Sequence, residues 1–268
     1  MTAVRIEAVV ADLDGTLVAR DFSISAASFW ALDQIRAAGI PLVLATGRAP
    51  VHLCEFPSLL RYADITVCCS GAIGLAGSRR LWQFHLTRAA VRLVVRTGEL
   101  YGAGIAGFDG TMWHATEAYR ILNPGIDGGG QCASVAAGTL SAIRCVTMAA
   151  VQSGDVLAEI TRVLSGAVRT GLSQVAGQPI LDIMPSPVDK GTGVLRALRS
   201  LGANPAAAVS FGDMPNDIPM FAVTGFAYAV GAGHPAVAGA ARETLVPVEQ
   251  DGFARKIQDL AASDWGLP

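Results

Sequence analysis

The stretch Val9-Val10-Ala11-Asp12-Leu13-Asp14-Gly15-Thr16-Leu17 decides the fold of this chain. Its apolar start, with the residues just before it, is typical of a buried parallel strand. Asp12 and Asp14 follow where that strand stops, and open α/β sheets bind ligands at the carboxyl ends of their strands. Two carboxylates this close repel each other unless a cation lies between them, and an oxygen-only ligand set favours Mg²⁺. The stretch therefore predicts an α/β fold with an acidic, metal-binding site at one edge of its sheet.

A local turn is the simplest alternative for this motif. Asp-Gly is a common turn dipeptide, and Asp-x-Asp-Gly also occurs in calcium-binding loops. The calcium interpretation fails on spacing, because Leu17, Val18 and Ala19 stand where further oxygen ligands are needed. The motif taken alone does not separate a plain loop from a catalytic one, so the rest of the chain has to decide.

Composition limits the class of protein. The chain has 268 residues, of which 51% are hydrophobic and 16% charged, enough for a large core in one big domain or two modest ones. The formal net charge is −2, so no basic face is expected and nucleic acid is excluded as a partner. Lys190 and Lys256 are the only lysines, and the first of them stands in a motif described below.

The apolar stretches are too short for targeting or membrane insertion. The first one stops at Asp12, and no uncharged run of about 18 apolar residues follows it. The cysteines are odd in number and form no Cys-x-x-Cys pair, which favours reduced core residues. We therefore expect a cytoplasmic protein without membrane contact. The five cysteines are Cys54, Cys68, Cys69, Cys132 and Cys145.

Predicted strands and helices alternate at both ends of the chain. This order indicates an α/β fold whose core is a Rossmann-like, doubly wound parallel sheet. The expected strands cover residues 5–10, 40–45, 64–69, 206–211, 226–230 and 244–248. The expected helices are one capped by Ser23 or Ser25 and ending near residue 38, and others at residues 50–60, 190–201, 219–223, 235–241 and 252–262.

The regular alternation of predicted strands and helices changes between residues 84 and 186. We therefore assign residues 1–83 and 187–268 to the Rossmann-like core, and 84–186 to a second, smaller α/β domain inserted into it, called the insertion below. Its aromatic residues Trp113 and Tyr119 are expected to pack in its interior. Within it the sequence predicts helices at 87–101 and 155–164, strands at 104–108, 142–149, 167–172 and 179–184, and loops through 125–130.

Polar groups follow the predicted core elements where a parallel sheet would bring them to one rim. A carboxylate can attack phosphorus and form an acyl-phosphate when a metal and a lysine neutralise the negative charge. The set therefore suits phosphoryl transfer to an aspartate. Its members are Asp12, Asp14, Thr46, Lys190, Asp213, Asn216 and Asp217.

Each of these groups has a place in that chemistry. Asp12 and Asp213 can hold Mg²⁺, and Lys190 can offset the charge of the nucleophile and the phosphate. The Thr46 hydroxyl can donate to a phosphate oxygen. Asp14 can protonate the leaving oxygen and then take a proton from the attacking water. Simpler alternatives are a solvated Lys190 and a helix-capping Thr46.

Four motifs follow one another along the chain. They are Asp12-Leu13-Asp14-Gly15-Thr16, Ala45-Thr46-Gly47-Arg48, Lys190-Gly191 and Gly212-Asp213-Met214-Pro215-Asn216-Asp217-Ile218-Pro219-Met220. In this order they resemble the motifs of the haloacid dehalogenase-like phosphatases, most closely the Cof-type sugar-phosphatase branch. The resemblance covers nearly the whole chain, and it implies that the insertion is a mobile cap over the site. One departure is Ser70-Gly71-Ala72, where family members often have Asn-Gly-Ala.

The resemblance also implies a role for the paired acids. Asp12 would be the nucleophile, and its carboxylate, the backbone carbonyl of Asp14 and the carboxylate of Asp213 would bind Mg²⁺. Dehalogenases lack an acid at the position of Asp14, and transport ATPases carry a threonine there. Asp14 therefore points to a phosphatase or a phosphomutase.

The remaining motif residues are assigned in the same way. Thr46, Gly47 and Lys190 would bind the phosphate. Asn216 and Asp217 would complete the metal shell or hold Lys190, although both could also cap the helix that follows. A further residue, Arg48, would contact substrate or make a surface ion pair. The four histidines have no shared ligand spacing, which excludes a zinc site.

These observations predict a Mg²⁺-dependent phosphatase that hydrolyses small phosphorylated metabolites, sugar phosphates on family grounds, through an aspartyl-phosphate intermediate. Its partner would be a small-molecule phosphomonoester, and the protein would be a monomer or a homodimer. One alternative is a phosphomutase or phosphotransferase of the same superfamily. The other is a non-catalytic regulatory protein on the same scaffold, which the intact set of catalytic groups disfavours.

Overall fold

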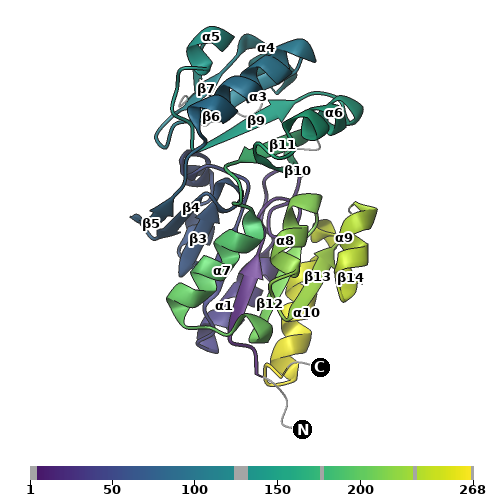
Figure 1. The fold of residues 1–268 in the computed structure, drawn as a ribbon. Helices are drawn as coiled ribbons and strands as arrows, with labels where there is room; N and C mark the ends of the chain where they lie inside the picture. Colours follow the sequence, from purple (N-terminus) through teal and green to yellow (C-terminus); the bar gives the residue numbers. More distant parts are fainter. Residues whose placement is uncertain (1–4, 124–131, 176–177, 232–233, 267–268) are drawn as a thin grey trace.

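The computed structural model describes residues 5–123, 132–175, 178–231 and 234–266, and its strands form two sheets, one above the other in Figure 1. The larger sheet runs in the order β14-β13-β12-β1-β2-β3-β4-β5. Its strands are β1 (Ala8–Ala11), β2 (Leu42–Ala45), β3 (Ile65–Cys68), β4 (Ile73–Ala76), β5 (Arg79–Gln83), β12 (Ala208–Gly212), β13 (Phe226–Val230) and β14 (Glu243–Leu245). All neighbours from β14 to β3 are parallel, and only β4 and β5 join antiparallel.

Strand β1 lies at the centre of the larger sheet, and both of its faces are buried. Its side chains alternate between the two faces, as the pleat of a strand requires. Val9 and Ala11 belong to the core that contains α1 and α10, whereas Ala8 and Val10 belong to the core that contains α7, α8 and α9. This arrangement explains why β1 is apolar throughout rather than alternating. The helices are α1 (Ala26–Ala37), α2 (Pro57–Leu60), α7 (Lys190–Leu201), α8 (Ile218–Phe221), α9 (Pro235–Ala240) and α10 (Gly252–Ala262).

The smaller sheet runs in the order β10-β11-β9-β6-β7-β8. One of its faces is covered by α3 and α6, whose apolar residues pack on Ile105, Met148 and Leu181. Its strands are β6 (Gly104–Phe108), β7 (Trp113–Ala115), β8 (Cys132–Ser134), β9 (Thr147–Val151), β10 (Arg169–Val175) and β11 (Gln178–Met184). Its helices are α3 (Arg88–Leu100), α4 (Glu117–Leu122), α5 (Ala137–Leu140) and α6 (Gly154–Leu164).

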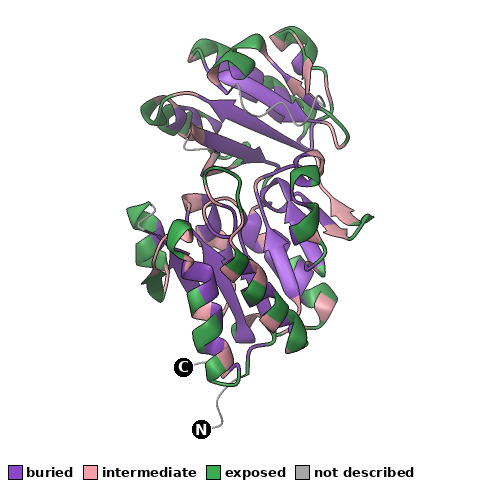
Figure 2. Ribbon diagram, turned by 180° about the vertical axis from the view of Figure 1, so that it is seen from behind, coloured by how far each residue is buried: buried purple, intermediate pink, exposed green. Residues whose placement is uncertain are grey.

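The other face of the smaller sheet looks toward the larger sheet. Phe108, Trp113 and Ile180 on this face belong to the same apolar cluster as the core strands. Figure 2 shows the central strands of both sheets buried and the outer sides of the helices exposed, whereas the edge strands β5 and β14 are partly exposed. The smaller sheet therefore covers the edge of the larger one at which the parallel strands end.

The predicted α/β architecture with a parallel core sheet is confirmed, but several elements differ from the expectation. The hairpin of β4 and β5 was not predicted, because β5 reads Arg-Arg-Leu-Trp-Gln and has the charged character of an edge strand. The strand expected at 142–149 is β9 at Thr147–Val151, and residues 50–60 form a 3-10 helix (η1, Pro50–Glu55) followed by α2. The short elements β7, β8, α4 and α5 were also missed.

Three smaller expectations can be compared with the structure. Ser25, not Ser23, caps α1 by accepting a hydrogen bond from the backbone of Ser28. The five cysteines form no disulfide with one another, but Cys54 is exposed, so its assignment to the core was wrong. The loops expected through 125–130 lie outside the described residues. No helix in the described part of the chain is long and apolar enough to cross a membrane.

Every strand of the smaller sheet lies between Gly104 and Met184, and every strand of the larger sheet lies outside that range. On this ground we propose residues 84–186 as the inserted unit and residues 1–83 and 187–268 as the core.

Candidate active site

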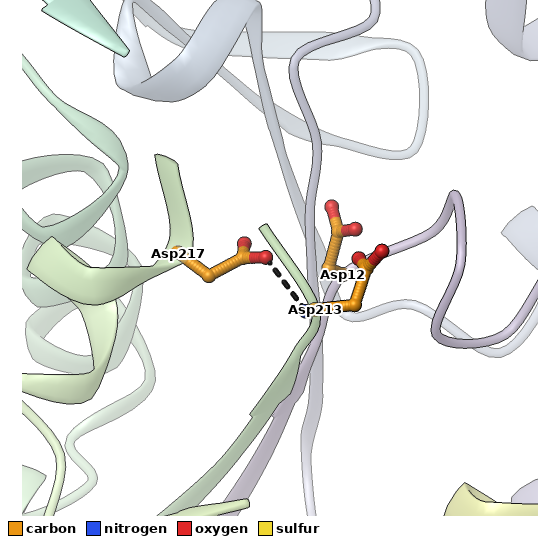
Figure 3. Close-up of side chains that lie close together, drawn as sticks. All are labelled: Asp12, Asp213 and Asp217. Carbon is orange, nitrogen blue, oxygen red and sulfur yellow. Dashed lines mark hydrogen bonds between the residues drawn. The ribbon is translucent and has the colours of Figure 1, made fainter. Parts of the chain in front are cut away.

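Three carboxylates meet where the central parallel strands of the larger sheet end. Asp12 follows β1, while Asp213 and Asp217 follow β12 (Figure 3). One oxygen from each lies within 4.8 Å of the others, and all three residues are buried. Because β1 and β12 are adjacent and parallel, the two loops after them reach the same rim.

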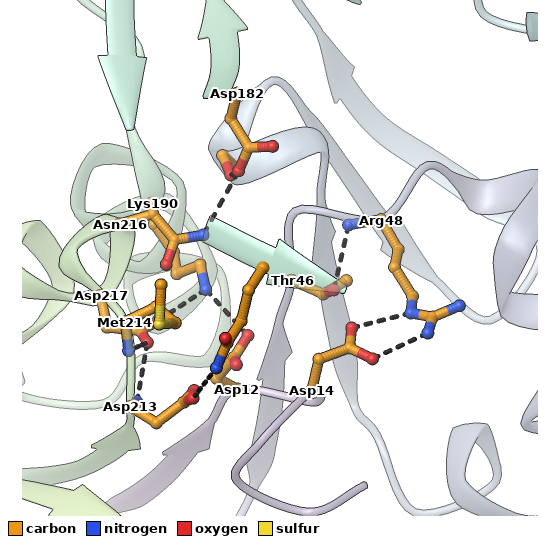
Figure 4. A network of polar contacts seen from close by, with 12 residues as sticks. Asp12, Asp14, Thr46, Arg48, Asp182, Lys190, Asp213, Met214, Asn216 and Asp217 are labelled. Carbon is orange, nitrogen blue, oxygen red and sulfur yellow. Dashed lines mark hydrogen bonds and ion pairs between the residues drawn. The ribbon is translucent and has the colours of Figure 1, made fainter. Parts of the chain in front are cut away.

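Lys190 supplies positive charge next to these three carboxylates. It is the first residue of α7, and Asp189 caps that helix by accepting a hydrogen bond from the backbone N–H of Thr192 at 2.8 Å. The Lys190 ammonium donates to Asp12 Oδ1 at 2.8 Å and to Asp217 Oδ1 at 2.6 Å (Figure 4). Lys190 is only 1% exposed, so the alternative of a solvated lysine is wrong. Burial opposes its charge, but the two carboxylates raise the pKa of Lys190 above its ordinary value.

Both carboxylate oxygens of Asp217 accept hydrogen bonds from neighbouring residues. Its second oxygen, Oδ2, accepts hydrogen bonds from the backbone N–H groups of Asp213 and Met214, both at 3.0 Å. The carboxylate therefore fixes the loop that carries Asp213 and also pairs with Lys190. Of the two roles expected for Asp217, the geometry favours the one of holding Lys190.

The donor set fits a divalent cation. Oδ1 of Asp213 is a buried oxygen without a hydrogen-bond partner in the described part of the chain. Burial raises the pKa of Asp12 to about 8 and the pKa of Asp213 well above its usual range, although Lys190 opposes both shifts. The single ammonium group of Lys190 thus does not fully balance the negative charge of the buried carboxylates. A hard cation with oxygen ligands would supply it.

The carboxylate of Asp14 points away from this cluster and pairs with Arg48. Both of its oxygens accept hydrogen bonds from the guanidinium, at 2.7 and 2.8 Å. Arg48 also donates to Glu55 at 3.1 Å, and its guanidinium lies over the rings of Phe22 and Phe56. Of the two alternatives for Arg48, a substrate contact or a surface ion pair, the structure shows an ion pair that is buried and bidentate and fixes Asp14 in place, while Arg48 also lines the pocket described below.

Thr46 and Gly47 follow β2 at the same rim. The Thr46 hydroxyl oxygen accepts a hydrogen bond from the Arg48 backbone N–H at 3.0 Å, so the hydroxyl keeps a hydrogen that it can donate. A Cβ on Gly47 would lie 2.8 Å from Oδ2 of Asp182. Gly47 thus allows the smaller sheet to approach the site closely.

The smaller sheet contributes polar side chains that sequence reasoning missed. Asp182 on β11 accepts hydrogen bonds from the Ser70 hydroxyl at 2.7 Å and from the Asn216 side-chain amide at 3.3 Å. Gln174 on β10 donates to Asp213 Oδ2 at 3.5 Å. Asn216, expected to complete the metal shell or to hold Lys190, thus links the core to the smaller sheet through its amide N–H, while its Oδ1 has no hydrogen-bond partner in the described part of the chain. A signal for Asp182 was available, because it is the one charged residue in the apolar run 179–184.

A pocket lies between the two sheets at this rim. Its cavity volume is about 60 Å³, which holds roughly four to six water-sized groups. Both sheets line it: the core contributes Asp12, Asp14 and Arg48, and the insertion contributes Trp113 and Asp182. Trp113 and Tyr119, which were expected to be packing residues, both line this pocket as well as being buried.

We expect Gly15→Ala to lower kcat/KM for phosphate release by about 10- to 100-fold, because a misplaced catalytic group costs that much. Gly15 has a φ of +82°, and a Cβ there would lie 2.2 Å from Asp213 Oδ2, so the carboxylate must move. The matched control is Gly77→Ala, since Gly77 has a φ of +57° with nothing within 4 Å. Steady-state kinetics on both variants measures the difference, and equal activities would show that the contact is unimportant.

The comparisons with known proteins agree on one family. The model of the haloacid dehalogenase-like hydrolase family matches residues 9–257. A phosphoglycolate phosphatase of Halobacterium salinarum is 27% identical over 248 residues, which is 90% of this chain and 92% of the relative. One of Halorubrum lacusprofundi is 29% identical over 93% of this chain and 95% of its own length. One of Methanothrix thermoacetophila is 40% identical over 76 residues, 28% of this chain and only about a third (34%) of that relative.

Solved structures share the fold. A subclass IIB sugar phosphatase has a TM-score of 0.85 at 20% identity, over 95% of this chain and 99% of that one. A phosphatase of Bacteroides thetaiotaomicron has a TM-score of 0.81 at 19% identity, over 97% of both chains. These comparisons agree with the resemblance predicted from the four motifs.

Proposed function

The chain belongs to the haloacid dehalogenase-like hydrolase family, and we propose that it is a Mg²⁺-dependent phosphatase of small phosphomonoesters that works through a phosphoryl group on Asp12. The observation that carries this proposal is the buried group of Asp12, Asp213 and Asp217 around Lys190. Relatives that align over nearly the whole chain are named phosphatases, which supports the same class of reaction.

In the first step, an Asp12 oxygen attacks phosphorus and the bond from phosphorus to the leaving oxygen breaks. Lys190 favours the ionised form of Asp12 and orients it, since its ammonium lies 2.8 Å from Asp12 Oδ1, and a bound cation would add to this effect. Asp14 gives a proton to the leaving oxygen, so the alcohol departs neutral. The Thr46 hydroxyl can donate a hydrogen bond to a phosphoryl oxygen.

In the second step, water attacks the phosphorus of the acyl-phosphate and the bond to Asp12 breaks. Asp14 takes the proton of that water, which returns both aspartates to their starting states. Arg48 holds the ionised Asp14 carboxylate through two hydrogen bonds, and this is the form that takes the proton of water in the second step. One of these hydrogen bonds must break when Asp14 carries the proton that it gives to the leaving oxygen.

A bound Mg²⁺ would neutralise the negative charge that phosphate and carboxylates share. The Asp12 and Asp213 carboxylates would hold it, together with the backbone carbonyl of Asp14, as the family resemblance implies. The unpartnered Oδ1 of Asp213 supports this assignment.

We expect Mg²⁺ at about 100 times its dissociation constant to raise the melting temperature by about 5 °C or more, since such binding adds about 2.7 kcal/mol. Asp213→Asn should remove most of this shift, because a carboxylate ligand is lost. The control is Asp259→Asn, on the exposed side of α10. Melting curves with EDTA and with Mg²⁺ measure the effect without relying on activity. An unchanged shift in Asp213→Asn would contradict the metal assignment.

The substrate can be identified with a panel of phosphomonoesters that includes sugar phosphates, 2-phosphoglycolate, nucleotides and phenyl phosphate. We propose a small substrate, because the cavity volume of the pocket is only about 60 Å³. Free phosphate that requires Mg²⁺ would support a phosphatase. An isomeric sugar phosphate in place of free phosphate would instead indicate a phosphomutase, and no conversion of any member would contradict both.

A further inference from the structure

His52 and Trp113 meet across the boundary between the two sheets. His52 lies in η1 of the core and Trp113 lies on β7 of the insertion. Their rings stack with centroids 5.5 Å apart and planes 8° apart. Both residues line the pocket next to the catalytic carboxylates, and both are more than nine-tenths buried.

Each of the two rings has a buried polar atom without a partner. His52 Nε2 and Trp113 Nε1 make no hydrogen bond to any described residue. Such atoms are uncommon and cost free energy, so each one calls for an explanation. His114, on the same strand as Trp113, is by contrast paired with Asp109 at 2.7 Å. Of the buried side-chain atoms in the described residues that lack a partner, those of His52, Trp113 and Asn216 belong to the lining of this one pocket.

The pocket offers no uncommitted positive charge among its described lining residues. Arg48 is the only lysine or arginine that lines it, and its guanidinium is engaged by Asp14 and Glu55. His52 does not supply a charge, because burial, together with the nearby Arg48, lowers its pKa to about 4. Asp182 adds a buried carboxylate, and the side chains that donate hydrogen bonds to it, among them Ser70 and Asn216, are neutral.

We propose that His52 and Trp113 are the residues that recognise the leaving group, and that they select an uncharged, hydroxyl-bearing group over one that carries a carboxylate. The indole N–H donates to a leaving-group hydroxyl, and the neutral imidazole donates to one or accepts from one according to its tautomer. A carboxylate in the same place would be buried beside Asp182, and no described lysine or arginine of the lining is left uncommitted to pair with it, which is strongly unfavourable. The subsite is complete only when the insertion lies on the core. This inference rests on the proposed phosphatase function.

Two matched substrate pairs test the charge preference. 2-Hydroxyethyl phosphate and 2-phosphoglycolate differ by a hydroxymethyl group in place of a carboxylate, as do glycerol 3-phosphate and 3-phosphoglycerate. We expect kcat/KM to be about 10- to 100-fold higher for the uncharged member of each pair. Equal values, or a preference for the carboxylates, would overturn the inference.

Two variants test the residues themselves. Trp113→Phe keeps an aromatic ring and removes the N–H, so the ratio of kcat/KM for glycerol 3-phosphate to that for phenyl phosphate should fall several-fold. His52→Arg adds a charge and should shift the preference toward 2-phosphoglycolate by tenfold or more. The control is Trp30→Phe, because Trp30 is 43% exposed on α1 and should leave both ratios unchanged.

The outcomes separate this inference from the proposed function. Hydrolysis of phenyl phosphate with unaltered ratios in both variants would overturn the subsite and leave the phosphatase intact. No hydrolysis of any phosphomonoester by the folded wild-type protein would overturn both.

Discussion

We expect Asp12→Asn to lower kcat/KM for phosphate release by at least about 10⁴-fold, the scale on which removal of a nucleophile acts. An amide oxygen is a far weaker nucleophile toward phosphorus than a carboxylate oxygen. The substitution also removes a charge from the pair with Lys190, which lies 2.8 Å away. Release of inorganic phosphate from the preferred substrate, with Mg²⁺ present, measures the loss.

The control for this variant is Asp155→Asn, since Asp155 is an exposed residue in the first turn of α6. It should keep full activity. A melting temperature of Asp12→Asn close to that of the wild type would show that the loss is chemical. Activity within a few-fold of the wild type would rule out Asp12 as the nucleophile.

A substitution of Lys190 is expected to have the second large effect, on stability as well as on activity. We expect Lys190→Met to lower the free energy of unfolding by about 3–5 kcal/mol, because removing one partner of a buried ion pair leaves the other uncompensated. Here two partners remain, Asp12 and Asp217. Activity should fall below detection, since the charge that balances the nucleophile and the phosphate is lost. Urea unfolding followed by circular dichroism measures the change.

The chain provides its own control for this variant. Lys256 is the other lysine and pairs with the half-exposed Glu243 near the surface, so Lys256→Met should cost no more than about 1 kcal/mol. The double variant Lys190→Met, Asp217→Asn should recover part of the lost stability, because one unpaired charge is also removed. Equal stabilities for the two lysine variants would contradict this account.

The parts of the site that the sequence predicted are those fixed by local position. Asp12, Thr46 and Asp213 each follow an apolar strand, and parallel strands carry whatever follows them to one rim. Lys190 starts a helix that packs against that rim, and the scarcity of lysine in this chain drew attention to it.

The parts that were missed depend on how two sheets meet. Asp182 and Gln174 come together with the motif residues only because the open face of the smaller sheet lies on the rim of the larger one. No spacing rule relates β10 or β11 to the loops of the core. The partner of Arg48 was unpredictable for a different reason: Asp14 and Arg48 both lie in core loops, and the sequence alone did not say whether the guanidinium would face Asp14, substrate or solvent.

The pairing of β1 with β12 has a consequence for how this protein folds while it is being synthesised. Ala8 pairs with Ala208, so the central strand finds one of its two neighbours only after the whole insertion has been synthesised. The smaller sheet draws all its strands from one continuous segment and needs no such wait. We therefore expect the smaller sheet to form first on the ribosome, while the edge of β1 that will bear β12 stays unpaired. Until β12 emerges, the apolar first strand is the segment most in need of a chaperone.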